Sequence, residues 1–146
     1  MPLSSQEMSD RFEIQDLIAE YCDIIDQGDF DRLNDVFTED AFIDYSAMGG
    51  AAGSRDEIIT FLNNVMPMFI NTQHMISNYQ IKIDGDTASG RIMCFNPMEI
   101  SGNPVFFLGL WYVDEYRRTP DGWRISKRVE EKGYQFNAPE GIAAGS

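Results

Sequence analysis

Residues 105–116, "VFFLGLWYVDEY", decide the architecture that the rest of the chain has to fit. Aromatic and β-branched residues are typical of β-strands, and in this run both alternating sets of side chains are largely apolar. A strand of this kind is buried on both sides of its sheet, so helices must cover one face and a further layer the other. The simplest further layer is a second copy of the sheet. We therefore expect a homo-oligomer, either a dimer or a trimer.

Turn signals around this run divide the second half of the chain into strands. The signals are "DGD" at 84–86, "SGN" at 101–103 and "PDG" at 120–122. They delimit four predicted strands, at residues 73–83, 86–100, 104–118 and 123–135. Pro97 lies inside the second of these and has no backbone N–H, so we expect a bulge or a sheet edge there.

The first half of the chain is predicted to be mainly helical. Ser4 and Glu7 fit a capping box that opens a helix over residues 4–27, and Gly28 fits its end. One face of this helix carries an apolar stripe, made of Ile14, Leu17, Ile18, Tyr21 and Ile25. The elements that follow are a short helix over 29–37, a β-like stretch at 41–47 and a helix from 54 to about 66.

Helices followed by an antiparallel meander indicate an α+β fold. Helices packed into the concave side of a curved, mostly antiparallel sheet give a cone-shaped α+β barrel with a pocket at its open end. A chain of 146 residues has the usual size of one domain. We expect residues 1–135 to form this domain and residues 136–146 to form a flexible tail.

The composition narrows the class of protein. A formal net charge of −13 argues against binding to nucleic acid or to anionic membrane surfaces, because both need clustered Lys and Arg. No signal peptide is recognisable, and no apolar run approaches the roughly 20 residues that span a bilayer. Cys22 and Cys94 match no metal or redox motif, so we expect buried thiols in a cytoplasmic protein.

The chain holds a single histidine, His74, within "FINTQHMISN" (69–78). An imidazole has an ordinary pKa of about 6.5 and is well suited to act as a base near neutral pH, although a structural, hydrogen-bonded histidine is the alternative. A catalytic histidine needs an orienting carboxylate, and Asp26 is the candidate. Its position alone favours an exposed carboxylate of the acidic turn "DQGDFD". One histidine makes no metal site and no phosphate-binding loop is present, so neither metal nor cofactor is expected.

Other side chains are candidates for the same site. Tyr21 lies on the apolar stripe and Tyr45 on the β-like stretch, and each is also consistent with an ordinary core tyrosine. Arg128 is expected to share a strand face with Arg124 and Ser126, where a surface ion pair is the alternative to stabilising charge on a substrate. The residues predicted to line a hydrophobic pocket are Phe42, Leu62, Met66, Met68, Phe107 and Trp111.

Several segments together resemble the SnoaL-like branch of the nuclear-transport-factor-2-like superfamily. They are "YCDIIDQGDFDRLNDVFTEDAFIDY" (21–45), "TQHMISN" (72–78), "DGDTASG" (84–90) and "DGWRISKR" (121–128). The branch includes dehydratases, a dehydrochlorinase and polyketide cyclases. Asp26 and His74 match the aspartate and histidine of its lyases, Tyr21 and Tyr45 match active-site tyrosines, and Arg128 falls near an arginine of the last strand. Scytalone dehydratase uses two histidines, whereas this chain has one.

The resemblance implies a cofactor-independent lyase that performs a dehydratase-type elimination. Its substrate would be a hydrophobic alicyclic, polyketide-like or steroid-like small molecule, and Asp26 and His74 would form the general base. Two alternatives share the fold. One is a ketone isomerase or cyclase, and the other is a non-catalytic module that binds a small ligand or takes part in assembly.

Overall fold

The computed structural model describes residues 2–139 and begins with a long helix, α1 (Ser5–Gln27). The Ser4 hydroxyl accepts a hydrogen bond from the Glu7 backbone N–H, and Gly28 ends the helix in the left-handed conformation at φ 77°. The predicted apolar stripe is buried along its whole length. α1 therefore ends and packs as its sequence predicts, and the Ser4 half of the predicted capping box is present at its start.

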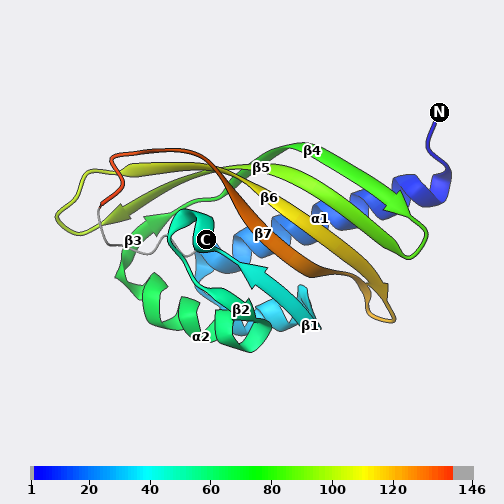
Figure 1. The fold of residues 1–146 in the computed structure, drawn as a ribbon, viewed down its shortest axis with the longest axis horizontal. Coiled ribbons are helices and arrows are strands. Elements are labelled where there is room, and N and C mark those ends of the chain that lie inside the picture. The colour runs from blue at the N-terminus through cyan, green and yellow to red at the C-terminus, as the bar shows by residue number, and fades with distance from the viewer. Residues whose placement is uncertain (1, 140–146) are drawn as a thin grey trace.

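The rest of the chain is built on one seven-stranded sheet. Its strands are β1 (Phe37–Asp44), β2 (Ala52–Ser54), β3 (Phe69–Thr72), β4 (Met75–Asp84), β5 (Thr87–Ile100), β6 (Phe106–Thr119) and β7 (Gly122–Phe136). They follow the order β2-β1-β7-β6-β5-β3, and β4 also pairs with β5. All pairs are antiparallel except β1 with β7, which is parallel. The sheet is mixed, curved and open (Figure 1).

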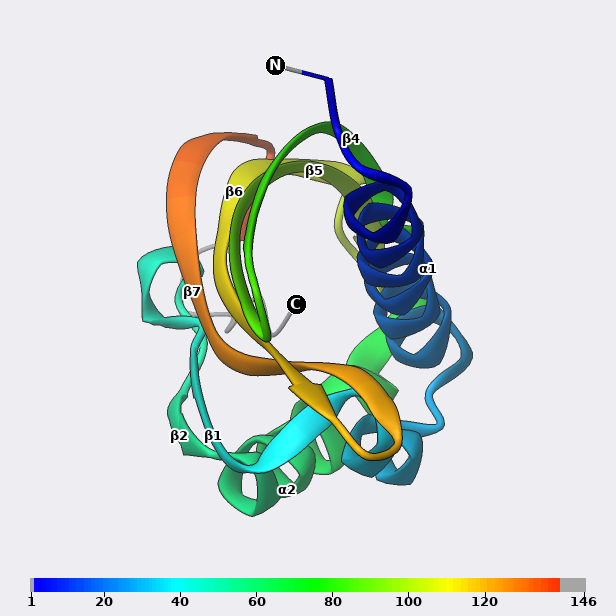
Figure 2. The same ribbon diagram turned by 90° about the vertical axis from the view of Figure 1, so that its right-hand side faces the viewer.

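The helices cover the concave side of this sheet. Viewed along its length, the sheet curls around α1, and α2 (Arg55–Val65) lies beside β1 and β2 (Figure 2). Three short 3₁₀ turns complete the chain: η1 (Phe30–Asp35), η2 (Ser46–Met48) and η3 (Met66–Met68). The predicted α+β class, with N-terminal helices on a curved and mostly antiparallel sheet, is confirmed, whereas the sheet stays open and does not close into the predicted barrel. Within residues 2–139, none of the helices combines the length and the apolar character that a membrane crossing requires.

Several boundaries differ from the prediction. The β-like stretch begins at Phe37, not 41, and ends at Asp44, because Tyr45 opens the turn η2. The strands β2 and β3 were not predicted, since three or four residues are too few to show an alternating pattern. Residue 136, the start of the predicted tail, is the last residue of β7, and residues 140–146 lie outside the described part of the chain.

Pro97 lies where the pairing of β5 passes from β3 to β4. β3 pairs with β5 up to Thr72, opposite Met98, and β4 resumes with Met75 opposite Phe95. Pro97 offers no N–H to a neighbouring strand, so the ladder breaks between β3 and β4. The two residues left outside the strands are Gln73 and His74. The irregularity expected at Pro97 is therefore a junction between two strands that share one partner.

The two faces of β6 differ in their surroundings. Its inner side chains, which include Tyr112 and Tyr116, are buried beneath the helices. Its outer side chains Phe107 and Trp111 are only half-buried, and Phe107 stacks between Phe95 and Phe136. The second buried face that the sequence predicts is thus an aromatic, partly exposed surface of this chain.

Candidate active site

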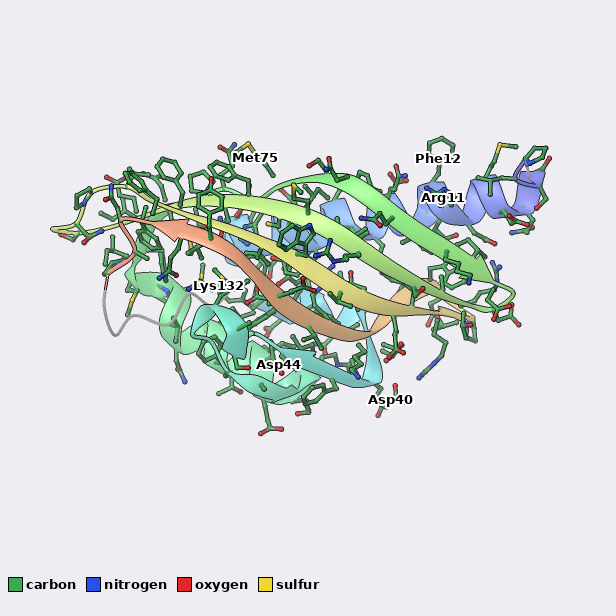
Figure 3. The ribbon with its side chains drawn as sticks, turned by 45° about the horizontal axis from the view of Figure 1, so that its top comes forward. Arg11, Phe12, Asp40, Asp44, Met75 and Lys132 are labelled. Atoms are coloured by element: carbon green, nitrogen blue, oxygen red, sulfur yellow. The ribbon has the colours of Figure 1, made fainter. Side chains whose placement is uncertain are left out.

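His74 is placed by the break in the sheet. The side chain of Asn96 donates to the backbone carbonyl of Gln73 (2.8 Å) and to the Thr72 hydroxyl (3.2 Å), which holds the short link between β3 and β4. His74 is free of the ladder, and its backbone N–H donates instead to Oδ2 of Asp26 (2.9 Å). The next residue, Met75, points outward to solvent (Figure 3). The imidazole consequently points inward.

Asp26 holds the backbone and the ring of His74 at the same time. Its second oxygen, Oδ1, lies 2.7 Å from the ring nitrogen Nδ1 of His74. The His74 side chain is fully buried, and 20% of the Asp26 side chain is exposed. A carboxylate in this position fixes the ring orientation and favours the tautomer with hydrogen on Nδ1. The other ring nitrogen, Nε2, is buried and has no hydrogen-bond partner within residues 2–139.

Arg128 lies in the core, and the prediction that it shares a face with Arg124 and Ser126 is wrong. A bulge in β7 causes the difference, because Ile125 pairs with Tyr116 whereas Lys127 pairs with the preceding residue of β6. Ser126 is the extra residue, and it reverses the alternation beyond it. Arg128 is therefore fully buried on the concave side of the sheet.

A carboxylate and two aromatic rings hold the Arg128 guanidinium. Nε and Nη2 donate to the two oxygens of Asp114 at 2.8 and 2.7 Å. The guanidinium carbon lies 4.3 Å from the ring centre of Tyr21 and 3.9 Å from that of Tyr112. Burial opposes the charge, but Asp114 outweighs it and holds the pKa of Arg128 well above its usual range. The third nitrogen, Nη1, has no hydrogen-bond partner among the described residues.

Tyr21 and Tyr45 lie next to this cation and hydrogen-bond to each other through their hydroxyl groups. Both are fully buried, and burial raises the pKa of each phenol above its ordinary value. They therefore remain neutral, and because one hydroxyl donates to the other, one of the two O–H groups is left to donate elsewhere. The position of Tyr45 requires a glycine at residue 50, because an added Cβ there would lie only 2.6 Å from the Tyr45 Cβ.

Sequence reasoning missed two acidic residues of this region. Asp114, on β6, accepts both bonds from Arg128 and a third from the Tyr116 hydroxyl (2.7 Å). Glu130, on β7, is 2% exposed, and neither of its carboxylate oxygens has a hydrogen-bond partner within residues 2–139. Burial raises the pKa of Glu130 well above its ordinary value. The one available signal was the pair of acidic residues inside the apolar run 105–116, and it does not separate the buried Asp114 from the exposed Glu115 or point to Glu130.

The predicted pocket residues are not gathered around His74. Leu62 and Met66 are buried, whereas Phe42 and Met68 are about half exposed. Phe107 and Trp111 lie on the outer face of the sheet, away from the imidazole. Solvent reaches the site at Asp26, which borders two surface hollows of about 640 and 330 Å³. Met66 borders the smaller of the two.

The described residues do not bring three or more His, Cys, Asp or Glu side chains together as a set of metal ligands. Cys22 and Cys94 are free and buried, and burial raises the pKa of the Cys22 thiol to about 12. Cys22 is therefore a neutral thiol at physiological pH. The groups that can act on a proton in this region are the imidazole, the Glu130 carboxyl and the two phenols.

Comparisons with known proteins agree with this architecture. A family model described as the SnoaL-like domain matches residues 6–129. The uncharacterized protein Rv2910c of Mycobacterium tuberculosis is 51% identical over 135 residues, which cover 91% of this chain and 92% of the relative. Hexachlorocyclohexane dehydrochlorinase 1 of Sphingobium indicum is 24% identical over 123 residues, covering 82% and 79%. The crystal structure of Kfla4162 from Kribbella flavida has a TM-score of 0.82 at 27% identity, covering 89% and 95%.

Proposed function

The chain belongs to the SnoaL-like domain family of the nuclear-transport-factor-2-like superfamily, and on that premise we propose that it is a cofactor-independent lyase with His74 as its general base. One observation carries the proposal. Asp26 holds Nδ1 of His74 at 2.7 Å, while Nε2 is buried and unpartnered. An imidazole fixed on one side and free on the other can accept a proton from a bound substrate.

The reaction is a dehydratase-type elimination. Nε2 of His74 removes a proton from a carbon next to the one that carries the leaving group. The electrons of that C–H bond form the new double bond, and the C–O bond to the leaving hydroxyl breaks. In the simplest scheme the imidazolium returns its proton to this oxygen, which departs as water. Asp26 stabilises the imidazolium between the two transfers, and general-base help of this kind contributes about 10²–10⁴-fold.

Arg128 and the two tyrosines supply the charge stabilisation. If the substrate is a ketone, negative charge develops on its carbonyl oxygen as the proton leaves carbon. Arg128 keeps its charge inside the core and has Nη1 unpartnered, and the neutral pair Tyr21 and Tyr45 beside it has one O–H group left to donate. Donors that are fixed before the reaction, in surroundings without water, stabilise such charge far better than they would in solution.

The proposed substrate is a hydrophobic alicyclic, polyketide-like or steroid-like small molecule. The concave side of the sheet is lined mainly by apolar and aromatic side chains, which favours a neutral ring over a charged ligand. A relative named for the dehydrochlorination of hexachlorocyclohexane is consistent with a substituted ring that loses a leaving group.

We also propose that the chain forms a dimer or a trimer through the outer face of its sheet. Aromatic side chains gather there, and Tyr134 and Phe136 of β7 remain 55% and 58% exposed. Phe95, Phe107 and Phe136 stack in one row on the same face. Covering such a row with a second copy would remove it from water. Sedimentation of the native protein and of Phe107→Ser tests this, since the variant should dissociate.

The activity test is a screen of cyclic hydroxyketones and steroid acyl derivatives, with His74→Gln and Asp26→Asn as variants. Release of water with formation of a double bond is expected, and His74→Gln should lower kcat/KM by about 10²–10⁴-fold. A rearrangement without change of mass would indicate an isomerase. Binding without turnover, unchanged in His74→Gln, would indicate a non-catalytic module. Met75→Gln, at the exposed residue beside His74, is the control and should keep native activity.

A further inference from the structure

Glu130 is the most unusual buried group in the described part of the chain. Five buried side-chain nitrogen or oxygen atoms there lack a hydrogen-bond partner, and four of them belong to His74, Arg128 and Glu130. Glu130 contributes both of its oxygens to this group. Buried polar atoms in native proteins are almost always paired, so this concentration needs a reason. We call these three residues the unpartnered set.

None of the described residues donates a hydrogen bond to a carboxylate oxygen of Glu130. Arg128, whose charge opposes the effect of burial on the pKa of Glu130, gives two nitrogens to Asp114 and does not hydrogen-bond to Glu130. The ionisable groups that interact electrostatically with Glu130 come from α1, β1, the turn after β1, β5, β6 and β7. They are Tyr21, Asp44, Tyr45, Cys94, Tyr112 and Arg128.

These surroundings favour the protonated form of Glu130. The phenols and the thiol are neutral, Asp44 is a like charge at the end of β1, and Asp114 already balances the charge of Arg128. Removal from water therefore dominates, and the pKa of Glu130 rises well above its ordinary value. A carboxylic acid kept neutral in an apolar site can donate a hydrogen bond or a proton, which a carboxylate cannot do.

We propose that Glu130 is a second acid of the active site, which gives its proton to the oxygen that leaves the substrate. This inference rests on the proposed elimination and deepens it. It assigns Glu130 a direct contact with the leaving hydroxyl, and it makes an alicyclic alcohol the substrate class. Arg128 and Glu130 are both buried on the inner face of β7, and Nη1 of Arg128 is also unpartnered among the described residues.

The step balances without a co-reactant. The O–H bond of Glu130 breaks as a new O–H bond forms on the leaving oxygen, and the C–O bond breaks to release water. His74 takes the proton from carbon, and that C–H pair becomes the double bond. His74 then loses one proton to solvent and Glu130 regains one. With a separate acid, the leaving oxygen need not lie on the same face of the ring as the proton that His74 removes.

The first test needs no substrate. Above the ordinary glutamate pKa of 4.5, the unfolded chain releases the Glu130 proton while the folded chain keeps it. The folded state then binds more protons, so the free energy of unfolding of the native protein falls as pH rises. Glu130→Gln removes this linkage. The ratio of unfolding constants, native to variant, should therefore rise about tenfold per pH unit from 4.5 toward neutral pH.

The control for this measurement is Glu131→Gln, at the adjacent and exposed glutamate paired with Arg91. The ratio of unfolding constants, native to Glu131→Gln, should not change with pH. A flat ratio for Glu130→Gln as well would overturn the proposal. Should that variant not fold, carbon-13 NMR of the glutamate-labelled native protein decides the matter. One carboxyl must keep its protonated shift at neutral pH, and ionisation of every glutamate there rules the proposal out.

The second test separates proton donation from binding. The probes are 3-hydroxycyclohexanone, which loses hydroxide, and 3-chlorocyclohexanone, whose chloride leaves without a proton. Glu130→Gln should lower kcat/KM for the alcohol by about 10²–10⁴-fold and leave the chloride within a few-fold. Equal losses on both would refute the donor role. His74→Gln should lower both, and failure of the native protein on both probes would count against the proposed lyase rather than against Glu130.

Discussion

Two groups of polar side chains lie under the same sheet, each with an arginine and a buried carboxyl group, and they differ in how fully they are paired. The first, which we call the Asp10 cluster, consists of Asp10, Arg118, Trp123 and Gln6. Asp10 accepts hydrogen bonds from Gln6 (3.0 Å), from the Trp123 indole (3.1 Å) and from two nitrogens of Arg118 (2.9 Å each). The second is the unpartnered set, in which four polar atoms have no partner within residues 2–139.

Each group combines an arginine with a carboxyl group. α1, β6 and β7 contribute the Asp10 cluster, whereas β7 and the link between β3 and β4 contribute the unpartnered set. Composition therefore does not distinguish them, although Arg118 is 32% exposed and Arg128 is fully buried. The two groups differ in the share of their polar atoms that have a hydrogen-bond partner. A structural cluster gains stability only when each member is paired, whereas a site that binds a ligand must leave atoms free for it. Substitutions in the two groups should therefore change the free energy of unfolding by different amounts.

The largest loss of stability is expected for Arg128→Met. The change leaves Asp114 as a buried carboxylate with only the Tyr116 hydroxyl as partner, and removing one member of a buried ion pair costs about 3–5 kcal/mol. Urea unfolding of native and variant protein measures it. The comparison substitution is Arg117→Met, in the exposed pair with Asp40, which should leave the unfolding midpoint unchanged. Equal midpoints for all three proteins would show that the buried pair contributes little.

The next effect concerns pH and the Asp10 cluster. Hydrogen bonds from Arg118, followed by those from Trp123 and Gln6, lower the pKa of Asp10 from 3.8 to about 2. A lowered carboxyl pKa adds stability that is complete above pH 3.8 and is lost as pH falls through about 2. Native protein should therefore lose stability more steeply than Asp10→Asn between these values. Parallel acid-unfolding curves would mean that Asp10 is not held ionised by its partners.

The smallest change in the free energy of unfolding is expected for Glu130→Leu, and this substitution should not lower it. Leucine fills a similar space and removes a buried acid that has no partner, so the free energy of unfolding should stay constant or rise by about 1 kcal/mol. Thermal and urea unfolding at neutral pH measure the change. Asp10→Leu, the same kind of substitution in the Asp10 cluster, should instead destabilise. A clear loss in Glu130→Leu would place Glu130 among the structural residues.

Much of this arrangement could be predicted from the sequence, and the failures share one physical cause. Apolar periodicity and capping residues predicted α1, and glycine-containing turns predicted the long strands. As the only histidine, His74 was a candidate from the sequence itself, whereas spacing alone favoured an exposed Asp26 and the resemblance was needed to pair the two. What failed was the assignment of strand faces. The bulge at Ser126 shifts the alternation by one residue, so Arg128 and Glu130 turn inward without any local signal.

A related ambiguity affected the pocket. Because "VFFLGLWYVDEY" is apolar on both faces, its pattern does not say which face meets the helices. Phe107 and Trp111 were assigned to the inside and lie outside, whereas Tyr112 and Asp114 lie inside. The burial of Asp114 and Glu130 depends on long-range packing, which a pattern of nearest neighbours does not encode.

The most direct test of the central claim is the tautomer of His74, read from long-range ¹⁵N–¹H NMR spectra. The single histidine makes the spectrum unambiguous. The account predicts hydrogen on Nδ1, directed at Asp26, and a bare Nε2 in the native protein, with loss of this preference in Asp26→Asn. A native ring with hydrogen on Nε2, or the same spectrum in both proteins, would contradict it. His74 would then have no free nitrogen held ready to accept a proton.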